Sequence, residues 1–346
     1  MKMYDVIIVG AGPAGSLLAK KLAEADLKIL LVEQKKLPRH KMCSGVISSF
    51  ARRILRKEGF GEVPDILCCH PKRIKGAHVY PKKGQPPYKL REKSCNVWRS
   101  DFDFWLTTKA SEVGAEVLDQ TRFIDFSEKK DTIEVNLKTI FGEQKEQAKI
   151  LVGADSGTSS IRRTLFPAEK IVWTSVYQEY WRGEIDLDPQ YLHTFLDREF
   201  SEFFALMNVK YGTKGKYIII NTNAMKGNTI PSYYNAFQEY LEEAHGFRGE
   251  KLLFKEACTS PKFFDASYEY KFGKRNILLI GEAAGLFNVF AEGISPALTS
   301  AVNASDAILK GGDQLLKQYT ENVQPLCRSL KLGWEGLLEM FPNFIT

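Results

Sequence analysis

The chain has 346 residues, 44% of them hydrophobic, which suggests two domains that bury a large core without disulfide or metal staples. Its net charge of +6 is too small for a dedicated nucleic-acid binder but compatible with an anionic substrate or acidic lipid headgroups. The 6 cysteines show no paired C-x-x-C spacing, so we expect neither a metal site nor an iron–sulfur cluster, and a reduced, cytoplasmic protein.

The strongest motif lies within residues 4–34. A β-branched run over 6–9 predicts a buried strand, and a glycine-rich turn over 10–15 opens a helical pattern. A second apolar run over 28–32 predicts another strand, which ends at Glu33. This order of strand, turn, helix, strand and acid is typical of a dinucleotide-binding unit.

The glycines of this turn are explained by the steric needs of a bound diphosphate. A diphosphate can sit on a helix N-terminus only where the preceding turn is tight and has no Cβ in the way. Gly10 makes the turn, Gly12 admits the phosphates, and Gly15 lets the helix pack closely on the strand. Glu33 can accept hydrogen bonds from a ribose hydroxyl, which favours FAD or NAD over NADP. A glycine turn in an unrelated βαβ unit is the alternative.

A basic segment over 35–41 leads to a loop of small residues. Cys43 is followed there by Ser44 and Gly45, which would let the backbone approach a flat ligand closely. A buried structural cysteine is the competing explanation for Cys43. Residues 48–57 then predict a basic amphipathic helix.

A β excursion out of the nucleotide-binding unit is predicted over 65–94, where prolines alternate with short strand-like runs. The chain returns at Arg99, which can hold a diphosphate or ribose, or form an ordinary surface ion pair. Ser100 or Asp101 is expected to cap the helix that begins there.

Two further apolar strands run into loops of small residues. The first delivers Asp155, whose carboxylate can bind another hydroxyl of the same cofactor, although Asp in a Gly/Ser turn is also ordinary turn chemistry. The second, over 276–280, ends in Gly281 and Glu282. A turn at 293–297 then opens a helix whose electropositive N-terminus suits an anion.

The region from 166 to 268 is aromatic and strand-like. It predicts a second sheet with a helix over 232–244 lying against it. Such rings are typical of a sheet core, and they also suit a pocket that holds an apolar substrate over a cofactor. Residues 315–341 predict a closing amphipathic helix.

Three sites in this order resemble the FAD-binding pattern of the para-hydroxybenzoate hydroxylase fold: residues 10–15 with Glu33, residues 153–155, and residues 281–285. Within that superfamily the chain is most similar to the geranylgeranyl reductase family. The matching segments are 39–45, 99–106 and 292–294.

The chain also departs from that family. Ser44, Ser156 and Glu282 stand where the family has glycine, glycine and aspartate. The family's aromatic signature, Tyr-x-Trp-x-Phe-Pro, would fall near residues 204–208 and is barely retained. The resemblance therefore concerns FAD binding more than the substrate.

The resemblance implies an α/β protein with a Rossmann-like FAD-binding domain of the glutathione reductase and para-hydroxybenzoate hydroxylase type. This domain would be discontinuous and interleaved with an α+β substrate domain that contains a β-sheet. The FAD-binding domain is expected over 1–65, 96–165 and 270–320, the substrate domain over 66–95 and 166–269, and C-terminal helices over 321–346.

The resemblance also implies a set of cofactor-binding residues. They are Gly10, Gly12, Pro13, Ala14, Gly15, Glu33, Gln34, Cys43, Ser44, Gly45, Arg99, Phe123, Asp155, Gly281, Glu282, Gly293 and Ile294. Phe123 would border the adenine with its backbone, and Arg99 would hold the far side of the cofactor. The loop that starts at Cys43 and the N–H groups of Gly293 and Ile294 would flank the isoalloxazine.

The implied activity is that of an FAD-dependent oxidoreductase that reduces C=C bonds of an apolar substrate, such as a prenyl chain. Because no second dinucleotide fingerprint follows, electrons would come from a ferredoxin-like carrier or from NAD(P)H. An FAD-dependent monooxygenase on an apolar or aromatic substrate, and a flavoprotein that passes electrons to quinone, are the alternatives. No catalytic residue is predicted, and Cys43 is only a weak candidate for the proton donor.

The N-terminal residues and the most apolar window of the sequence suggest where in the cell the protein is located. The chain begins almost directly with a predicted strand, which leaves no room for a signal peptide. The most apolar long window, 276–302, contains two glutamates and several glycines and is not expected to span a membrane. We expect a cytoplasmic protein, with any membrane contact peripheral, at the inner face, and made by the basic residues of 52–57.

Overall fold

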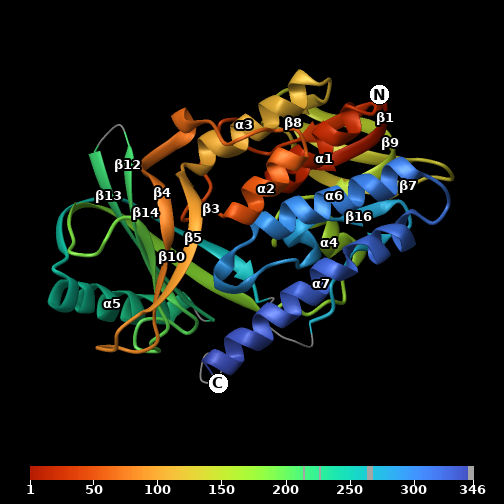
Figure 1. Cartoon of the computed structure of the whole chain (residues 1–346). Coiled ribbons are helices and arrows are strands. Elements are labelled where there is room, and N and C mark those ends of the chain that lie inside the picture. Colours follow the sequence, from red (N-terminus) through yellow and green to blue (C-terminus); the bar gives the residue numbers. More distant parts are fainter. Residues whose placement is uncertain (213–214, 226, 263–267, 342–346) are drawn as a thin grey trace.

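The computed structural model describes residues 1–212, 215–225, 227–262 and 268–341. Two sheets of 8 strands each organise these residues, and most of the helices gather around the first sheet (Figure 1). The prediction of an α/β protein is confirmed.

The first sheet has the order β15-β16-β9-β1-β2-β6, and the five strands from β16 to β6 form its parallel core. Its strands are β1 (Met3–Val9), β2 (Ile29–Val32), β6 (Glu116–Leu118), β7 (Arg122–Glu128), β8 (Ile133–Thr139), β9 (Gly142–Gly153), β15 (Gly273–Lys274) and β16 (Ile277–Leu279). Strands β7 and β8 extend β9 as an antiparallel meander, and β15 pairs with β16 antiparallel. The register aligns the last residues of β1, β2, β9 and β16, so these four strands end at one level.

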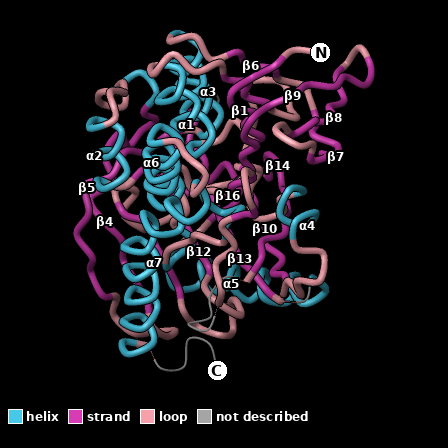
Figure 2. Tube along the Cα trace, turned by 90° about the vertical axis from the view of Figure 1, so that its right-hand side faces the viewer, coloured by secondary structure: helices cyan, strands magenta, loops and turns pink. Residues whose placement is uncertain are grey.

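Helices pack on this sheet and bury its β-branched residues. They are α1 (Pro13–Ala23), α2 (Ser49–Lys57), α3 (Arg99–Glu112), α4 (Ser160–Leu165), α6 (Ile294–Lys310) and α7 (Leu315–Met340), with short 3-10 turns η3 (Gly281–Ala284) and η4 (Val289–Ala291) before α6. Helix α1 contacts both α3 and α6, and the three lie side by side near β1 (Figure 2). One continuous apolar core joins these helices to the strands of the first sheet.

The second sheet has the order β14-β10-β13-β12-β11-β4-β5-β3. Its strands are β3 (Val46–Ile47), β4 (Cys68–Tyr80), β5 (Tyr88–Val97), β10 (Trp173–Glu184), β11 (Tyr191–Phe195), β12 (Ala205–Gly212), β13 (Gly215–Ala224) and β14 (Arg248–Pro261), and its other elements are η1 (Asp65–Leu67), η2 (Gly227–Thr229) and α5 (Ile230–His245). All pairs are antiparallel except β4 with β11.

The two faces of the second sheet differ in chemistry. On one face, Met207, Val209 and Ile220 pack against Phe237 and Leu241 of α5. Because successive side chains of a strand point to opposite faces, their neighbours along β10, β12 and β13 point away from α5. That second face carries buried polar side chains, and it meets the loop that follows β2.

Several predicted elements are confirmed. The helices expected over 48–57, 232–244 and 315–341 are α2, α5 and α7. The hydroxyl of Ser48 caps α2 by accepting a hydrogen bond from the N–H of Ala51 at 3.1 Å. The excursion over 65–94 is the β4–β5 pair. No helix among the described residues combines the length and apolar character needed to cross a bilayer.

One helix boundary was predicted wrongly. Helix α3 begins at Arg99, and neither Ser100 nor Asp101 caps it, because both lie inside its first turn. The Arg99 guanidinium pairs with the Asp103 carboxylate four residues on, which requires Arg99 itself to be helical. The Ser100 hydroxyl instead donates to Asp101 at 3.2 Å.

Candidate active site

The three sites found in the sequence meet at the carboxyl edge of the first sheet, where parallel α/β sheets bind ligands. Gly10 has a φ of +108°, and a Cβ there would overlap the carbonyl oxygen of Ala154. The glycine turn therefore touches the loop that carries Asp155. On its other side, a Cβ added to Gly281 would lie 3.4 Å from the Cβ of Ala14. All three loops are thus in contact.

The turn before α1 is shaped to receive a ligand. A Cβ on Gly15 would overlap the carbonyl oxygen of Gly10, so this glycine is required by the protein itself. A Cβ on Gly12 would meet nothing nearer than Nη2 of Arg39, at 3.8 Å. Gly12 is the N-cap of α1, Pro13 follows it, and no side chain in the described part of the chain caps this helix. Its free N–H groups form an anion site.

Glu33 ends β2 beside this turn and is 5% exposed. Its Oε2 accepts hydrogen bonds from the N–H of Ala11 at 3.3 Å and from Nε of Arg39 at 3.0 Å. Its Oε1 accepts one from the N–H of Lys35 at 3.0 Å. The carboxylate therefore lies where the sequence predicted, held by a cation that the predicted site did not include.

Arg39 links this acid to the buried carboxylate of Asp103, which lies 3.0 Å from its Nη1. Arg99 binds the same carboxylate through Nε at 2.8 Å and Nη2 at 2.9 Å. Burial alone would lower the pKa of Arg99, but the Asp103 carboxylate outweighs it and raises that pKa above its ordinary value. Arg99 is therefore neither a surface ion pair nor a free cation. The spacing of Arg99 and Asp103 on one helix was the only local signal of this pair.

The outer members of the predicted set lie farther along the same edge. Phe123 is buried at the start of β7, and Gln34 is exposed at the end of β2. The N–H of Thr121 donates to the carbonyl of Glu33 at 2.9 Å, which ties the start of β7 to the end of β2. The backbone at Phe123 is thus close to the acid that was predicted to bind ribose.

The two carboxylate oxygens of Asp155 differ in their hydrogen bonding. Oδ2 accepts a hydrogen bond from the N–H of Ser160 at 2.8 Å, which is ordinary turn chemistry at the start of α4. Oδ1 is buried and finds no hydrogen-bond partner among the residues that the structure describes. Burial raises the pKa of Asp155. An unpaired buried acceptor of this kind suits a donor from a bound ligand, such as a sugar hydroxyl.

Two departures from the family pattern are partners in space. Ser156 has a φ of +70°, a conformation that favours the family's glycine. Its hydroxyl donates to Oε2 of Glu282 at 2.8 Å. The two departures from the family pattern are therefore coupled, since Ser156 supplies the hydrogen-bond donor and Glu282 supplies the acceptor.

The N-terminus of α6 is less open than expected. Gly293 and Ile294 begin this helix, and Ile294 is buried. The carboxylate of Glu292 accepts a hydrogen bond from the N–H of Ser295 at 2.8 Å, so the protein already places one negative group there. Burial raises the pKa of Glu292, although hydrogen bonds from the helix start oppose this effect.

The Cys43 loop lies between the two sheets. The Cys43 thiol interacts with the Arg99 guanidinium and accepts a hydrogen bond from the N–H of Gly45 at 3.3 Å. A Cβ on Gly45, whose φ is +65°, would overlap both the carbonyl oxygen of Val97 and Nζ of Lys210. The carbonyl of Ser44 accepts a hydrogen bond at 3.4 Å from the Asn208 side chain of β12.

A hydrogen-bonded chain of side chains crosses the same interface. Nε2 of His40 lies 2.7 Å from Oε2 of Glu256, and the Tyr180 hydroxyl donates to Oε1 of Glu256 at 2.7 Å. Gln178 also donates to the Tyr180 oxygen. The side chain of His40 is 50% exposed whereas Tyr180 is 1% exposed, so the chain runs from the surface into the protein.

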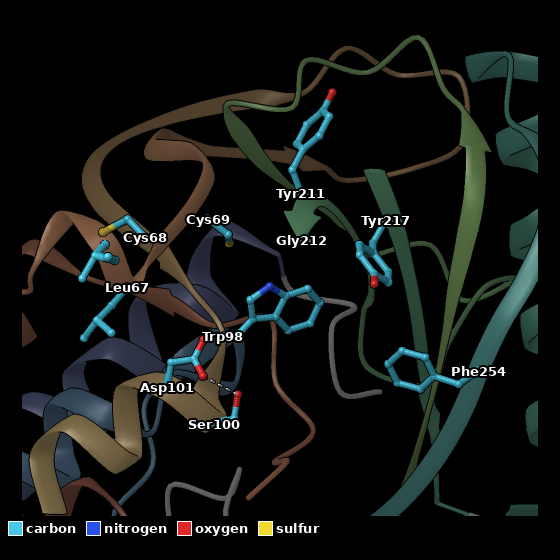
Figure 3. A pocket seen from close by; sticks show the side chains of 11 residues that line it. Leu67, Cys68, Cys69, Trp98, Ser100, Asp101, Tyr211, Gly212, Tyr217 and Phe254 are labelled. Atoms are coloured by element: carbon cyan, nitrogen blue, oxygen red, sulfur yellow. Dashed lines mark hydrogen bonds between the residues drawn. The ribbon is translucent and has the colours of Figure 1, made fainter. Parts of the chain in front are cut away.

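A cavity of about 380 Å³ adjoins this interface (Figure 3). Four aromatic side chains line it, those of Trp98, Tyr211, Tyr217 and Phe254. The rest of the lining is Ile66, Leu67, Cys68, Cys69, Ser100, Asp101 and Gly212, so the cavity has an apolar part and a polar part. The Trp98 ring also contacts Lys210, whose Nζ lies 5.1 Å from the ring centre. These side chains give an apolar substrate a surface beside the Cys43 loop.

The predicted set missed several residues of this interface: Arg39, His40, Trp98, Asp103, Gln178, Tyr180, Asn208, Lys210 and Glu256. The basic segment before Cys43 and the i,i+4 spacing of Arg99 and Asp103 were the only sequence signals for any of them. Those on β10, β12 and β14 have no motif, and only the pairing of strands places them over the loop.

Comparison with known proteins agrees with this geometry. Residues 3–330 match a protein-family model described as FAD binding domain. Protein CbrA of Escherichia coli O6:H1 is 28% identical over 343 residues, which cover 94% of this chain and 87% of that protein.

The fold is shared with solved flavoproteins. A geranylgeranyl bacteriochlorophyll reductase-like protein from Thermoplasma acidophilum has a TM-score of 0.80 and 18% identity, covering 100% of this chain and 87% of that one. The myxobacterial halogenase CndH, which is FAD-dependent, has a TM-score of 0.76 and 16% identity, covering 98% of this chain and 82% of that one. The fold prediction is confirmed, and the cofactor is FAD.

The residues present fit this cofactor. The open space at Gly12 and the uncapped α1 suit a diphosphate, Glu33 suits a ribose, and the unpaired Oδ1 of Asp155 suits a further hydroxyl.

Substitution of two glycines by alanine separates cofactor binding from folding. Gly15→Ala should destabilise the apoprotein by about 1–3 kcal/mol or more, because the new methyl overlaps a backbone carbonyl. Gly12→Ala should leave the apoprotein folded and weaken FAD binding at least about tenfold, which is about 1.4 kcal/mol. Thermal unfolding of both apoproteins and fluorescence titration with FAD measure these effects. Equal stability losses in the two apoproteins would contradict this assignment.

The Ser156–Glu282 pair predicts an order of stabilities. Ser156→Ala loses the hydrogen bond to a carboxylate and keeps the positive φ, so it should cost about 1–2 kcal/mol. Ser156→Gly loses the same bond but relieves the backbone, so it should cost roughly 1 kcal/mol less. Chemical denaturation of the three apoproteins tests the order. A glycine variant less stable than the alanine variant would refute it.

Proposed function

The chain belongs to the FAD-binding-domain family, and from that premise we propose that it is an FAD-dependent reductase of carbon–carbon double bonds in an isoprenoid or comparable apolar substrate. The observation that carries this proposal is the chain from His40 through Glu256 to Tyr180. Reduction of an alkene adds a hydride and a proton, so a buried site needs a route for protons. Reduction of a quinone also takes up protons, so the chain of side chains supports proton-coupled reduction of a bound substrate in general, and the product identifies which substrate is reduced.

The roles of the chain's own residues follow from their placement. When bound and reduced, FAD supplies the hydride. The residues at Gly12 and Glu33 hold its diphosphate and ribose, and the loop at Cys43 borders the reacting region. The cavity beside Trp98 takes the apolar part of the substrate against its aromatic side chains.

Tyr180 is the proposed proton donor. Burial, and then its hydrogen bond to Glu256, raise the pKa of Tyr180, so the hydroxyl stays protonated. Burial alone would raise the pKa of Glu256, but hydrogen bonds from His40 and Tyr180 outweigh it and lower that pKa. In the proposed step the hydroxyl proton leaves Tyr180 for the substrate carbon. Glu256 returns a proton that it receives from His40, which exchanges with water.

Other features support a reductase on an apolar substrate. The fold is common to this chain and to a reductase-like protein over their lengths. Electrons would come from a ferredoxin-like carrier or NAD(P)H, since one dinucleotide site is present in the sequence. Exposed basic residues of α2, among them Arg53 and Arg56, offer a peripheral contact for a membrane that holds such a substrate.

The proposal predicts the effect of removing one hydroxyl. Tyr180→Phe should lower the rate of alkene reduction by about 10²–10⁴-fold, the usual contribution of a general acid. The assay is anaerobic turnover of the dithionite-reduced protein with prenyl diphosphates, prenyl ether lipids and polyprenols, and mass spectrometry detects the saturated product. Tyr177→Phe is the matched control, because Tyr177 lies on the same strand but its hydroxyl binds Glu179 on the opposite face.

Two results would count against the reductase. An unchanged substrate panel would remove it, and substrate-dependent oxygen uptake with a hydroxylated product would assign a monooxygenase instead. Equal rates for Tyr180→Phe and Tyr177→Phe would show that Tyr180 is not the proton donor.

A further inference from the structure

Lys210 is a buried cation without an acid. It lies on β12, and its side chain is 0% exposed. The two other fully or nearly buried cations, Lys20 and Arg162, each pair with a carboxylate, that of Glu24 and Glu169 respectively. Within the part of the chain that the structure describes, no carboxylate lies within 4.0 Å of Nζ of Lys210.

The ammonium is held by neutral groups. It donates a hydrogen bond to the carbonyl of Val97 and lies over the ring of Trp98. An ammonium has three donors, and Val97 is its one hydrogen-bond acceptor among the described residues. Such a charge is costly to bury, because the hydration that it loses is not replaced by an opposite charge. A methionine of similar length would fill the same space without that cost.

The charges around Lys210 do not balance it. Arg39 and Arg99 form a closed group with Glu33 and Asp103, two positive charges against two negative. The remaining titratable groups that act on Lys210 are the thiols of Cys43 and Cys69. One positive charge is therefore left over at the junction of β12 and the Cys43 loop.

This charge faces the loop that the proposed function places at the reacting region. A Cβ on Gly45 would overlap Nζ of Lys210, so the ammonium packs directly against the backbone of this loop. Asn208, two residues earlier on the same face of β12, holds the carbonyl of Ser44. Asn208 and Lys210 thus both contact the Cys43 loop through polar groups, and the ammonium of Lys210 brings three hydrogen-bond donors to this contact.

We propose that Lys210 is the counter-ion of an anion that binds against the Gly45 loop during the reaction. The inference rests on the proposed function and names the charge of what this site accepts. Two sources share that chemistry: the reduced flavin, which is anionic at neutral pH, and a carboxylate or phosphate of the substrate. In either case the bound anion would neutralise the ammonium of Lys210, which explains why a buried lysine without an acid is present at this position.

Stability of the apoprotein distinguishes this role from a structural one. Burial lowers the pKa of Lys210 from 10.5 to about 8, so the unfolded chain binds more protons than the folded one between these values. Stability of the wild-type apoprotein should therefore rise with pH from about 8 to 10.5, relative to a variant without this group. Lys210→Met should melt higher than wild type at pH 7 and should lack that rise. A lysine that merely held the loop would make the same variant melt lower.

Two ligand measurements identify the anion. The first is the two-electron reduction potential of bound FAD in wild type and in Lys210→Met. If the reduced flavin is the anion, the potential should fall by about 30 mV for each tenfold loss of preference for the reduced state. The second is the rise in melting temperature that inorganic diphosphate causes in the FAD-loaded protein, in which the cofactor already fills the anion site at the start of α1. If a substrate acid is the anion, this rise should be present in wild type and lost in the variant.

Lys255→Met is the matched control, because Lys255 lies exposed on β14 of the same sheet. It should leave the potential and the effect of diphosphate as in wild type. The proposal is overturned if neither ligand measurement differs between wild type and Lys210→Met, whatever the stability of the variant. A protein that bound no FAD would refute the proposed function, while the pH dependence of apoprotein melting in wild type and Lys210→Met would still decide whether Lys210 carries an uncompensated charge.

Discussion

The structure depends on close contact between backbones at the carboxyl edge of the first sheet. Gly10 approaches the loop after β9 so closely that no side chain fits between them, and Gly15 approaches Gly10 in the same way. These contacts require four parallel strands to end at one level, which their register ensures. The result is a cradle with free N–H groups and two acids, Glu33 and Asp155, whose close backbone contacts are made within the protein itself.

A short stretch of chain then connects this cradle to the second sheet. Arg39 turns toward the acids of the first sheet, and the adjacent His40 turns toward Glu256 of the second. A few residues on, Gly45 is enclosed by β5 and β12. The loop therefore takes part in the charge balance of the first-sheet acids and also contacts the second sheet, so both sheets hold it.

The second sheet divides its two tasks between its faces. The face beneath α5 is an ordinary apolar core. The opposite face carries Gln178, Tyr180, Asn208 and Lys210, all of them buried. Buried polar groups are costly, and their concentration opposite the Cys43 loop is the feature on which the proposed proton donor and the proposed anion site both rest. The aromatic cavity adjoins it, so an apolar chain and a polar reacting end can be accommodated side by side.

The sequence alone determined the cofactor cradle, because its requirements are local: β-branched strands, glycines where backbones touch, and an acid at a strand end. The long helices were predictable for the same reason, from their periodicity and caps. The tertiary structure decided what those patterns do not encode. Arg99 is neutralised by Asp103, Ser156 compensates Glu282, and His40 meets Glu256 across 216 positions of the chain. Burial and pairing of charges arise only when distant strands come together. The sequence alone therefore does not indicate that Lys210 is buried without an acid, because that follows from the packing of β12 against Gly45.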